Sequence, residues 1–139
     1  MKLILKDGRH HMLRFDRGEE VKEGLKKFCE ARGIRAASFT MIGAVSDTSL
    51  SWFDLANKTY RDEDFTGEFE ITGVTGNISR MGTDTVIHMH GNFSGSDFKT
   101  FSGHVKRLVV SVTAEVFLIA LDGTIERGPD KTTGLNLML

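Results

Sequence analysis

Two of the five histidines in this chain stand two residues apart, within the stretch Thr85-Val-Ile-His-Met-His-Gly-Asn-Phe-Ser-Gly95. Side chains alternate faces along a strand, so His88 and His90 share one face, while Ile87 and Met89 point to the other, which we expect to be the core side. Two imidazoles on one face of a strand can bind a single metal ion. They can equally form hydrogen bonds in a half-buried sheet, and this spacing alone does not decide between the two roles.

A third ligand would have to come from another part of the chain, and His104 is the leading candidate. It follows a turn region at residues 95–97, so an antiparallel hairpin would bring it beside His88 and His90. Three neutral imidazoles with one open position form the arrangement of a catalytic zinc site, in which bound water becomes hydroxide near neutral pH. Because imidazole suits several divalent ions, the sequence predicts zinc or another divalent metal at these three residues. His10 and His11 are adjacent in an N-terminal turn, and we expect both to face solvent.

One carboxylate, Glu115, stands in the otherwise apolar run Val110–Leu121. A buried carboxylate needs a partner because desolvating its charge is costly. We therefore expect a structural ion pair with Arg14 or Arg35, and keep a catalytic or metal-supporting role for Glu115 as the second interpretation.

A single clear helix is predicted near the N-terminus. Its apolar residues fall at i, i+4, i+7 and i+8, on one helical face: Val21, Leu25, Phe28 and Cys29. Asp16 and Glu19 resemble a capping pair at its start, and Gly33 is expected to end it. Cys29 lies on the buried face, so we interpret it as a core residue rather than a reactive thiol.

The remaining segments have the period of strands. Short strands are expected on both sides of the turn at Asp7-Gly8 and on both sides of a break at Gly43, with a further strand or two in 65–81 and strands in 83–95 and 100–121. The last is rich in Val, Ile, Leu and Phe, which favours a central position. The sequence thus predicts one α+β domain, residues 1–139, with a mostly antiparallel β-sheet and one main helix. The apolar tail 132–139 is expected either to add a strand or to pack on a neighbouring subunit.

The composition limits the kinds of partner. Of 139 residues, 40% are hydrophobic and 27% charged, as in water-soluble globular proteins. No apolar run is long enough to span a bilayer, the N-terminus lacks the core of a signal peptide, and the single cysteine fits a reducing compartment, so we expect a cytoplasmic protein without membrane contact. A formal net charge of −1 argues against a surface built to grip phosphate backbones. The only dense basic spot is Lys106-Arg107, with Lys99 expected nearby.

Several segments together resemble the plant- and prokaryote-conserved (PPC) domain, over roughly residues 9 to 122. Residues 13–50 are similar to its start, and Gly67-Glu-Phe-Glu-Ile-Thr72 resembles the Gly-Arg-Phe-Glu-Ile-Leu motif of its plant members. Its later blocks appear here in the same order: 76–79, 88–95, 101–105 and 111–122. The resemblance implies a compact α+β domain with an antiparallel sheet, assembled as a homotrimer.

In plants this domain follows an AT-hook, an Arg-Gly-Arg-Pro element that enters the minor groove of DNA. The present sequence has no such element, and its nearest string, Glu126-Arg-Gly-Pro-Asp130, has acidic flanks unsuited to a phosphate-lined groove. It also has Glu68 and Thr72 where the plant motif has arginine and leucine. The DNA-binding role attached to relatives therefore belongs to an element that is not found here.

The domain is also similar in fold to acetolactate decarboxylase, a zinc enzyme that binds its metal with a His-x-His pair and a later histidine. His88, His90 and His104 match that order, and Glu115 could correspond to a carboxylate near the metal. Three functions follow. The first is a trimeric binding module that contacts other proteins or a small molecule and has a three-histidine metal site. The second is a metal-dependent enzyme on a small carbonyl or carboxylate substrate, with Arg14 or Arg35 pairing with a substrate carboxylate. The third is direct DNA binding.

Overall fold

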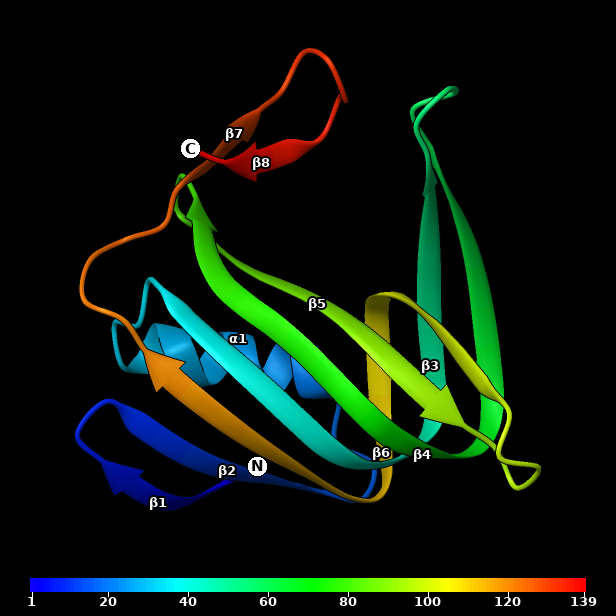
Figure 1. Ribbon diagram of the computed structural model, residues 1–139. Coiled ribbons are helices and arrows are strands. Elements are labelled where there is room, and N and C mark those ends of the chain that lie inside the picture. The colour runs from blue at the N-terminus through cyan, green and yellow to red at the C-terminus, as the bar shows by residue number, and fades with distance from the viewer.

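Antiparallel strands make up most of the chain, and the computed structural model describes all 139 residues (Figure 1). One sheet has the order β1-β2-β6-β3-β4-β5, and β7 and β8 pair separately. The strands are β1 Lys2–Asp7, β2 His10–Asp16, β3 Ala37–Asp54, β4 Thr59–Met81, β5 Asp84–Ser94, β6 Thr100–Ala120, β7 Arg127–Pro129 and β8 Asn136–Met138, and the helix is α1 Val21–Ala31. The predicted α+β class with one helix is therefore confirmed.

The last long strand, β6, is central, as predicted. Its C-terminal half lies between β2 and β3, while its first residues pair with β5. Since β3 pairs with β4 and β4 with β5, the pairing of β5 with β6 closes these four strands on themselves. The hairpin predicted to carry the histidines is part of this closure.

The strands β3 and β4 are longer than the sequence suggested. Gly43 does not separate two strands but lies at a bulge inside one strand of 18 residues. Its φ is +145°, and a Cβ there would lie 2.2 Å from the carbonyl oxygen of Thr113. Glycine therefore lets β3 approach β6 and bend without ending. Likewise, the predicted strand or two in 65–81 belongs to one strand that begins at Thr59.

The helix buries the four predicted residues. Its N-cap is Glu20, whose side chain accepts a hydrogen bond from the Glu23 N–H, so the predicted Asp16–Glu19 capping pair is wrong. Glu19 instead accepts the Asp16 N–H at 2.8 Å, within the turn before the helix. The expected stop is confirmed: Gly33 has a φ of +64°, and the N–H of the next residue donates to the Cys29 carbonyl.

One hydrophobic core of 23 residues joins the sheet and the helix, which packs against β5 and β6. Cys29 is fully buried in it, and burial raises the pKa of its thiol to about 12, consistent with a core residue rather than a nucleophile. No helix here combines the length and hydropathy that crossing a bilayer requires.

Two hairpins extend beyond this core on the same side of the molecule (Figure 1). One is the far part of β3 and β4, and the other is the C-terminal hairpin of β7 and β8. The tail therefore adds a strand, which was one of its two predicted roles. The Lys58 amine, between β3 and β4, donates to the Lys131 carbonyl and so links the tips of the two hairpins.

Candidate metal centre

The three predicted histidines come together on one face of the β5–β6 hairpin. His90 lies directly opposite His104 in the strand register, and His88 is two residues away along β5. Their ring centroids are 5.1 to 5.3 Å apart. One nitrogen from each ring lies within 4.8 Å of the other two. On the other face, Ile87 and Met89 enter the core, as the alternation predicted.

This arrangement fits a divalent ion with imidazole ligands. Three nitrogens at about 2.1 Å from one zinc ion in tetrahedral geometry lie about 3.4 Å from one another. Small rotations of the rings would bring nitrogens that are within 4.8 Å to that separation. The donor set leaves one tetrahedral position for water or another ligand, as in catalytic rather than structural zinc sites.

Burial and positive neighbours keep at least two of these rings neutral at physiological pH. Burial is the main cause that lowers the pKa of His104 to about 4, and the neighbouring His88 and His90 add to it. Burial also lowers the pKa of His88, followed by the positive charge of Arg127. A neutral imidazole is the form that binds metal, so these shifts favour the metal-binding form of both rings.

Arg127, on β7, connects His88 to the rest of the structure. Its guanidinium donates to the Ser79 hydroxyl at 2.7 Å, to the Asn77 side-chain oxygen at 3.1 Å and to the Asn136 carbonyl at 3.0 Å. Its Nη2 also lies 3.3 Å from Nδ1 of His88. Because a guanidinium only donates, Nδ1 is the acceptor. Arg127 thus fixes the orientation of the His88 ring.

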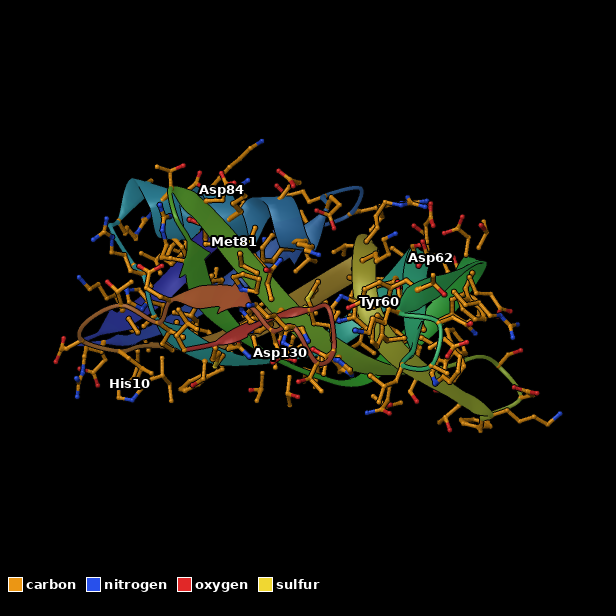
Figure 2. All side chains as sticks on the ribbon, turned by 90° about the horizontal axis from the view of Figure 1, so that it is seen from above. His10, Tyr60, Asp62, Met81, Asp84 and Asp130 are labelled. Carbon is orange, nitrogen blue, oxygen red and sulfur yellow. The ribbon has the colours of Figure 1, made fainter.

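A cavity of about 400 Å³ adjoins the histidines. It lies where α1, the two projecting hairpins and the start of β5 meet. Figure 2 shows the C-terminal hairpin, marked by Asp130, beside the hairpin that carries Tyr60. The Tyr60 ring packs beside the His104 ring with a centroid distance of 5.8 Å. The lining residues are Lys22, Tyr60, Met81, Val86, Ile87, His88, His104, Arg127, Gly134, Leu135, Asn136 and Leu137.

The family model of the Plants and Prokaryotes Conserved (PCC) domain matches residues 4–122. The chain belongs to this family. The resemblance inferred from the sequence motifs is therefore confirmed, and the match includes all three histidines. Arg127 and the C-terminal hairpin lie beyond the matched residues.

Known structures agree with this assignment. A metal-containing protein from Archaeoglobus fulgidus is 32% identical, with a TM-score of 0.89 over 100% of this chain and 99% of that one. A "putative DNA binding protein" from Bacteroides thetaiotaomicron is 28% identical, with a TM-score of 0.93 over 96% and 94% of the two chains. Acetolactate decarboxylase from Bacillus subtilis shares the fold at 13% identity, with a TM-score of 0.57 over 88% of this chain and 57% of the enzyme. None of the curated proteins matches the sequence.

The sequence did not predict three residues of the cavity beside the histidines. Lys22 lies outside the apolar face predicted for the helix, and Tyr60 lies in the segment between two expected strands. Arg127 was noticed only as part of a string unlike an AT-hook. The one signal for Arg127 in the sequence was its position just before an apolar tail that could fold back on the sheet.

The prediction that Glu115 is buried in an ion pair with Arg14 or Arg35 is wrong. Glu115 is exposed on the outer face of the sheet and lines a different cavity, with Ile42 and Phe117. Arg14 lies opposite it in the register but forms its ion pair with Asp16.

Arg35 and His11 also differ from the predictions. Arg35 is exposed and forms no ion pair. His10 is exposed as expected, but His11 is buried, because β2 begins at His10 and turns the next side chain inward onto Phe28.

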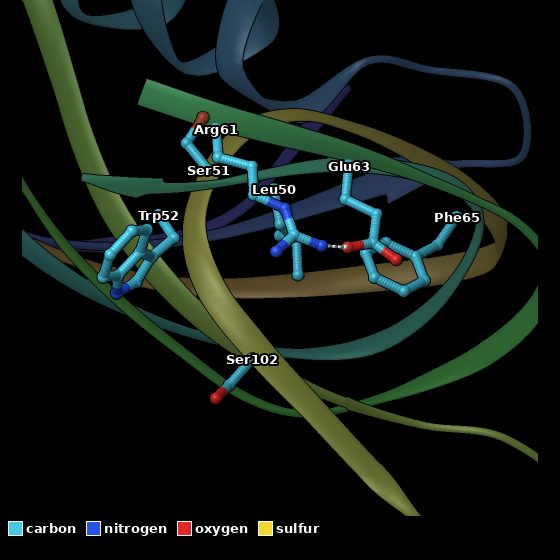
Figure 3. A pocket seen from close by; sticks show the side chains of 7 residues that line it. All are labelled: Leu50, Ser51, Trp52, Arg61, Glu63, Phe65 and Ser102. Atoms are coloured by element: carbon cyan, nitrogen blue, oxygen red, sulfur yellow. Dashed lines mark hydrogen bonds and ion pairs between the residues drawn. The ribbon is translucent and has the colours of Figure 1, made fainter. Parts of the chain in front are cut away.

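A second cavity, of about 250 Å³, lies against the long β3–β4 hairpin and contains no histidine. Its only two charged residues, Arg61 and Glu63, pair with each other at 3.5 Å (Figure 3). Trp52 is exposed at its edge. With its charges paired internally, this cavity offers less for a polar ligand than the one beside the histidines.

Proposed function

We propose that this chain is a metal-binding module that holds a divalent ion on His88, His90 and His104. The observation that carries the proposal is the convergence of three ring nitrogens, from two paired strands, within 4.8 Å of one another. The metal-containing relative from Archaeoglobus fulgidus, similar over its whole length, supports it. Zinc fits the donor set and would act as a Lewis acid with one position free for a ligand.

Metal binding has a structural consequence at His88. Its Nδ1 accepts from Arg127 in the present arrangement. If the metal binds Nδ1, that lone pair is used; if it binds Nε2, the ring proton moves to Nδ1, which then cannot accept. Either way the Arg127–His88 hydrogen bond is lost, and one guanidinium N–H becomes free beside the cavity.

We also propose that the module is a homotrimer whose contacts use the outer face of the sheet. Ile42 and Phe117 are 59% and 46% exposed there, next to each other around one cavity. Large exposed apolar side chains grouped on one face are typical of protein interfaces. The cavity beside the histidines is suited to a small molecule.

The metal proposal is tested on protein purified without a histidine tag and supplemented with zinc. We expect about one zinc per chain by mass spectrometry of the metal, and zinc affinity lower by about 100-fold or more when His88→Ala and His90→Ala are combined. His10→Ala is the matched control, because this exposed histidine lies outside the cluster. Absence of bound zinc, or equal affinity in the double variant, would refute the metal site.

The second candidate function is a metal-dependent enzyme acting on a small carbonyl or carboxylate compound. The specific observation in its favour is that the metal site opens on a cavity large enough for such a substrate. No side chain is assigned a catalytic role. The test compares turnover of such compounds by zinc-loaded and metal-free protein. Turnover by the zinc-loaded protein alone would favour the enzyme over the binding module.

Direct DNA binding ranks third. The basic residues singled out in the sequence are paired with carboxylates: Lys106 with Asp62, Arg107 with Asp47 and Lys99 with Asp97. A phosphate backbone would have to displace these partners. The charge of the whole chain, −1, adds no general attraction.

A further inference from the structure

The cavity beside the histidines contains positive groups and no carboxylate. Lys22 and Arg127 line it together with two of the three histidines, and none of its twelve lining residues is acidic. This is unusual in a chain with more acidic than basic residues, 19 against 18. A divalent ion on the neutral imidazoles would add further positive charge at the same place.

Lys22 occupies a costly position for a cation. It lies in the first turn of α1, where the helix dipole is positive and favours negative charge. It is only partly exposed and makes no hydrogen bond or ion pair. The charges of Glu20 and Glu23 act on it, but burial has the larger effect and lowers its pKa. A counter-ion in the cavity would offset these costs.

Arg127 has the same lack of a negative partner. All four of its contacts are to neutral groups: a hydroxyl, an amide, a backbone carbonyl and an imidazole. Neither cation therefore has a carboxylate partner in the cavity. The release of one Arg127 N–H on metal binding would give a bound anion a second donor.

An apolar wall of the cavity is formed by Met81, Val86, Ile87, Leu135 and Leu137. A ligand that satisfies both the two cations and this apolar wall has a charged end for Lys22 and Arg127 and a short hydrocarbon part for these side chains. The volume of about 400 Å³ suits a molecule of a few carbon atoms.

We propose that this cavity binds a small organic anion, a carboxylate with a short aliphatic body, anchored by Lys22 and Arg127 next to the three histidines. The proposal rests in part on the metal site, because the bound ion and the released Arg127 N–H would both strengthen binding of the anion. Lys22 and the apolar wall do not depend on the metal, so weaker binding is expected without it.

The experiment compares butyrate with butyramide, which has the same shape but no charge, by calorimetry on zinc-loaded and metal-free protein. We expect butyrate to bind and butyramide to bind at least about tenfold more weakly, with tighter butyrate binding in the zinc-loaded form. Lys22→Gln should weaken butyrate binding about tenfold while leaving the zinc content at the wild-type level. The matched control is Lys27→Gln, an exposed lysine on the same helix that does not line the cavity.

Several results would overturn the proposal: equal binding of butyrate and butyramide, equal effects of Lys22→Gln and Lys27→Gln, or inorganic phosphate binding more tightly than butyrate. These outcomes are separable from failure of the metal site. A protein that takes up no zinc but still binds butyrate through Lys22 would refute the metal centre and support the anion site. A protein that binds zinc but not butyrate would support the metal centre and refute the anion site.

Discussion

At the scale of single residues, the environment of the histidines decides their protonation. His104 and His88 are partly buried and face Lys22, and Arg127 contacts His88. Each of these factors disfavours a charged imidazolium. A metal ion that binds these imidazoles would therefore compete with few protons near neutral pH.

The metal-free protein should lose stability in acid through these histidines. The pKa of His104 is about 4 in the folded chain against 6.5 for the free side chain, so the unfolded state binds more protons between these values. Stability from this group is complete above pH 6.5 and is lost as the pH falls toward 4. Chemical denaturation of chelator-treated protein across this range should show a falling unfolding free energy, with a shallower fall in His104→Gln. An identical slope in that variant would contradict the stated environment of His104.

Glu115 is exposed although its neighbours along the strand are apolar. Its neighbours in β6 are apolar, and the sequence interpretation equated apolar neighbours with burial. The structure shows that Phe117 is itself exposed, so the outer face of the sheet is apolar as well. A carboxylate among apolar residues is then no sign of a buried charge.

At the scale of elements, one glycine allows the two central strands β3 and β6 to pair closely. Gly43 allows β3 to follow β6 through a bulge with φ of +145°. This brings the later part of β3 beside the beginning of β6, where Ser51 lies opposite His104. The position of the third histidine thus depends on a residue far from it along the chain.

Gly43→Ala should destabilise the fold strongly. The left-handed φ costs about 1–3 kcal/mol for a residue with a Cβ, and the clash with the Thr113 carbonyl adds to it. Each kcal/mol lowers Tm by roughly 4 °C. Gly73→Ala is the matched control, since a Cβ there meets nothing within 4 Å. Thermal unfolding that ranks the two variants equally would be inconsistent with the bulge.

The contrast between local and distant contacts explains what the sequence could predict. The histidine pair, the hairpin to His104 and the buried face of the helix follow from alternation and periodicity over short stretches. The two cations of the cavity come from distant parts of the chain. Lys22, at the start of the helix, is more than 60 residues from His88, and Arg127, on β7, is 39 residues from it. No periodic pattern relates such distant residues, so the strand and helix patterns did not place Lys22 and Arg127 beside the histidines.

At the scale of the whole molecule, the two faces of the sheet have different chemistry. The inner face and α1 enclose the core, and the cavity with its positive groups is lined by residues of both projecting hairpins. The outer face of β2, β3, β4 and β6 carries exposed apolar side chains around Ile42 and Phe117. The ligand site and the apolar face therefore lie on different parts of the chain and can be altered independently.

This separation makes the trimer testable without disturbing the metal site. If the outer face forms the contact, the protein should sediment at micromolar concentration as a species of about 46 kDa, three times the 15.4 kDa of one chain. Introducing charge with Ile42→Glu and Phe117→Glu should give monomers, because burying an unpaired carboxylate in an interface costs several kcal/mol. Leu55→Glu is the matched control: this leucine is 60% exposed in the turn between β3 and β4, away from the patch. Monomeric wild-type protein would refute the trimer, whereas a double variant that remains trimeric would place the contact on another surface.

Zinc content that stays at the wild-type level in the monomeric variant would show that one chain supplies the whole metal site.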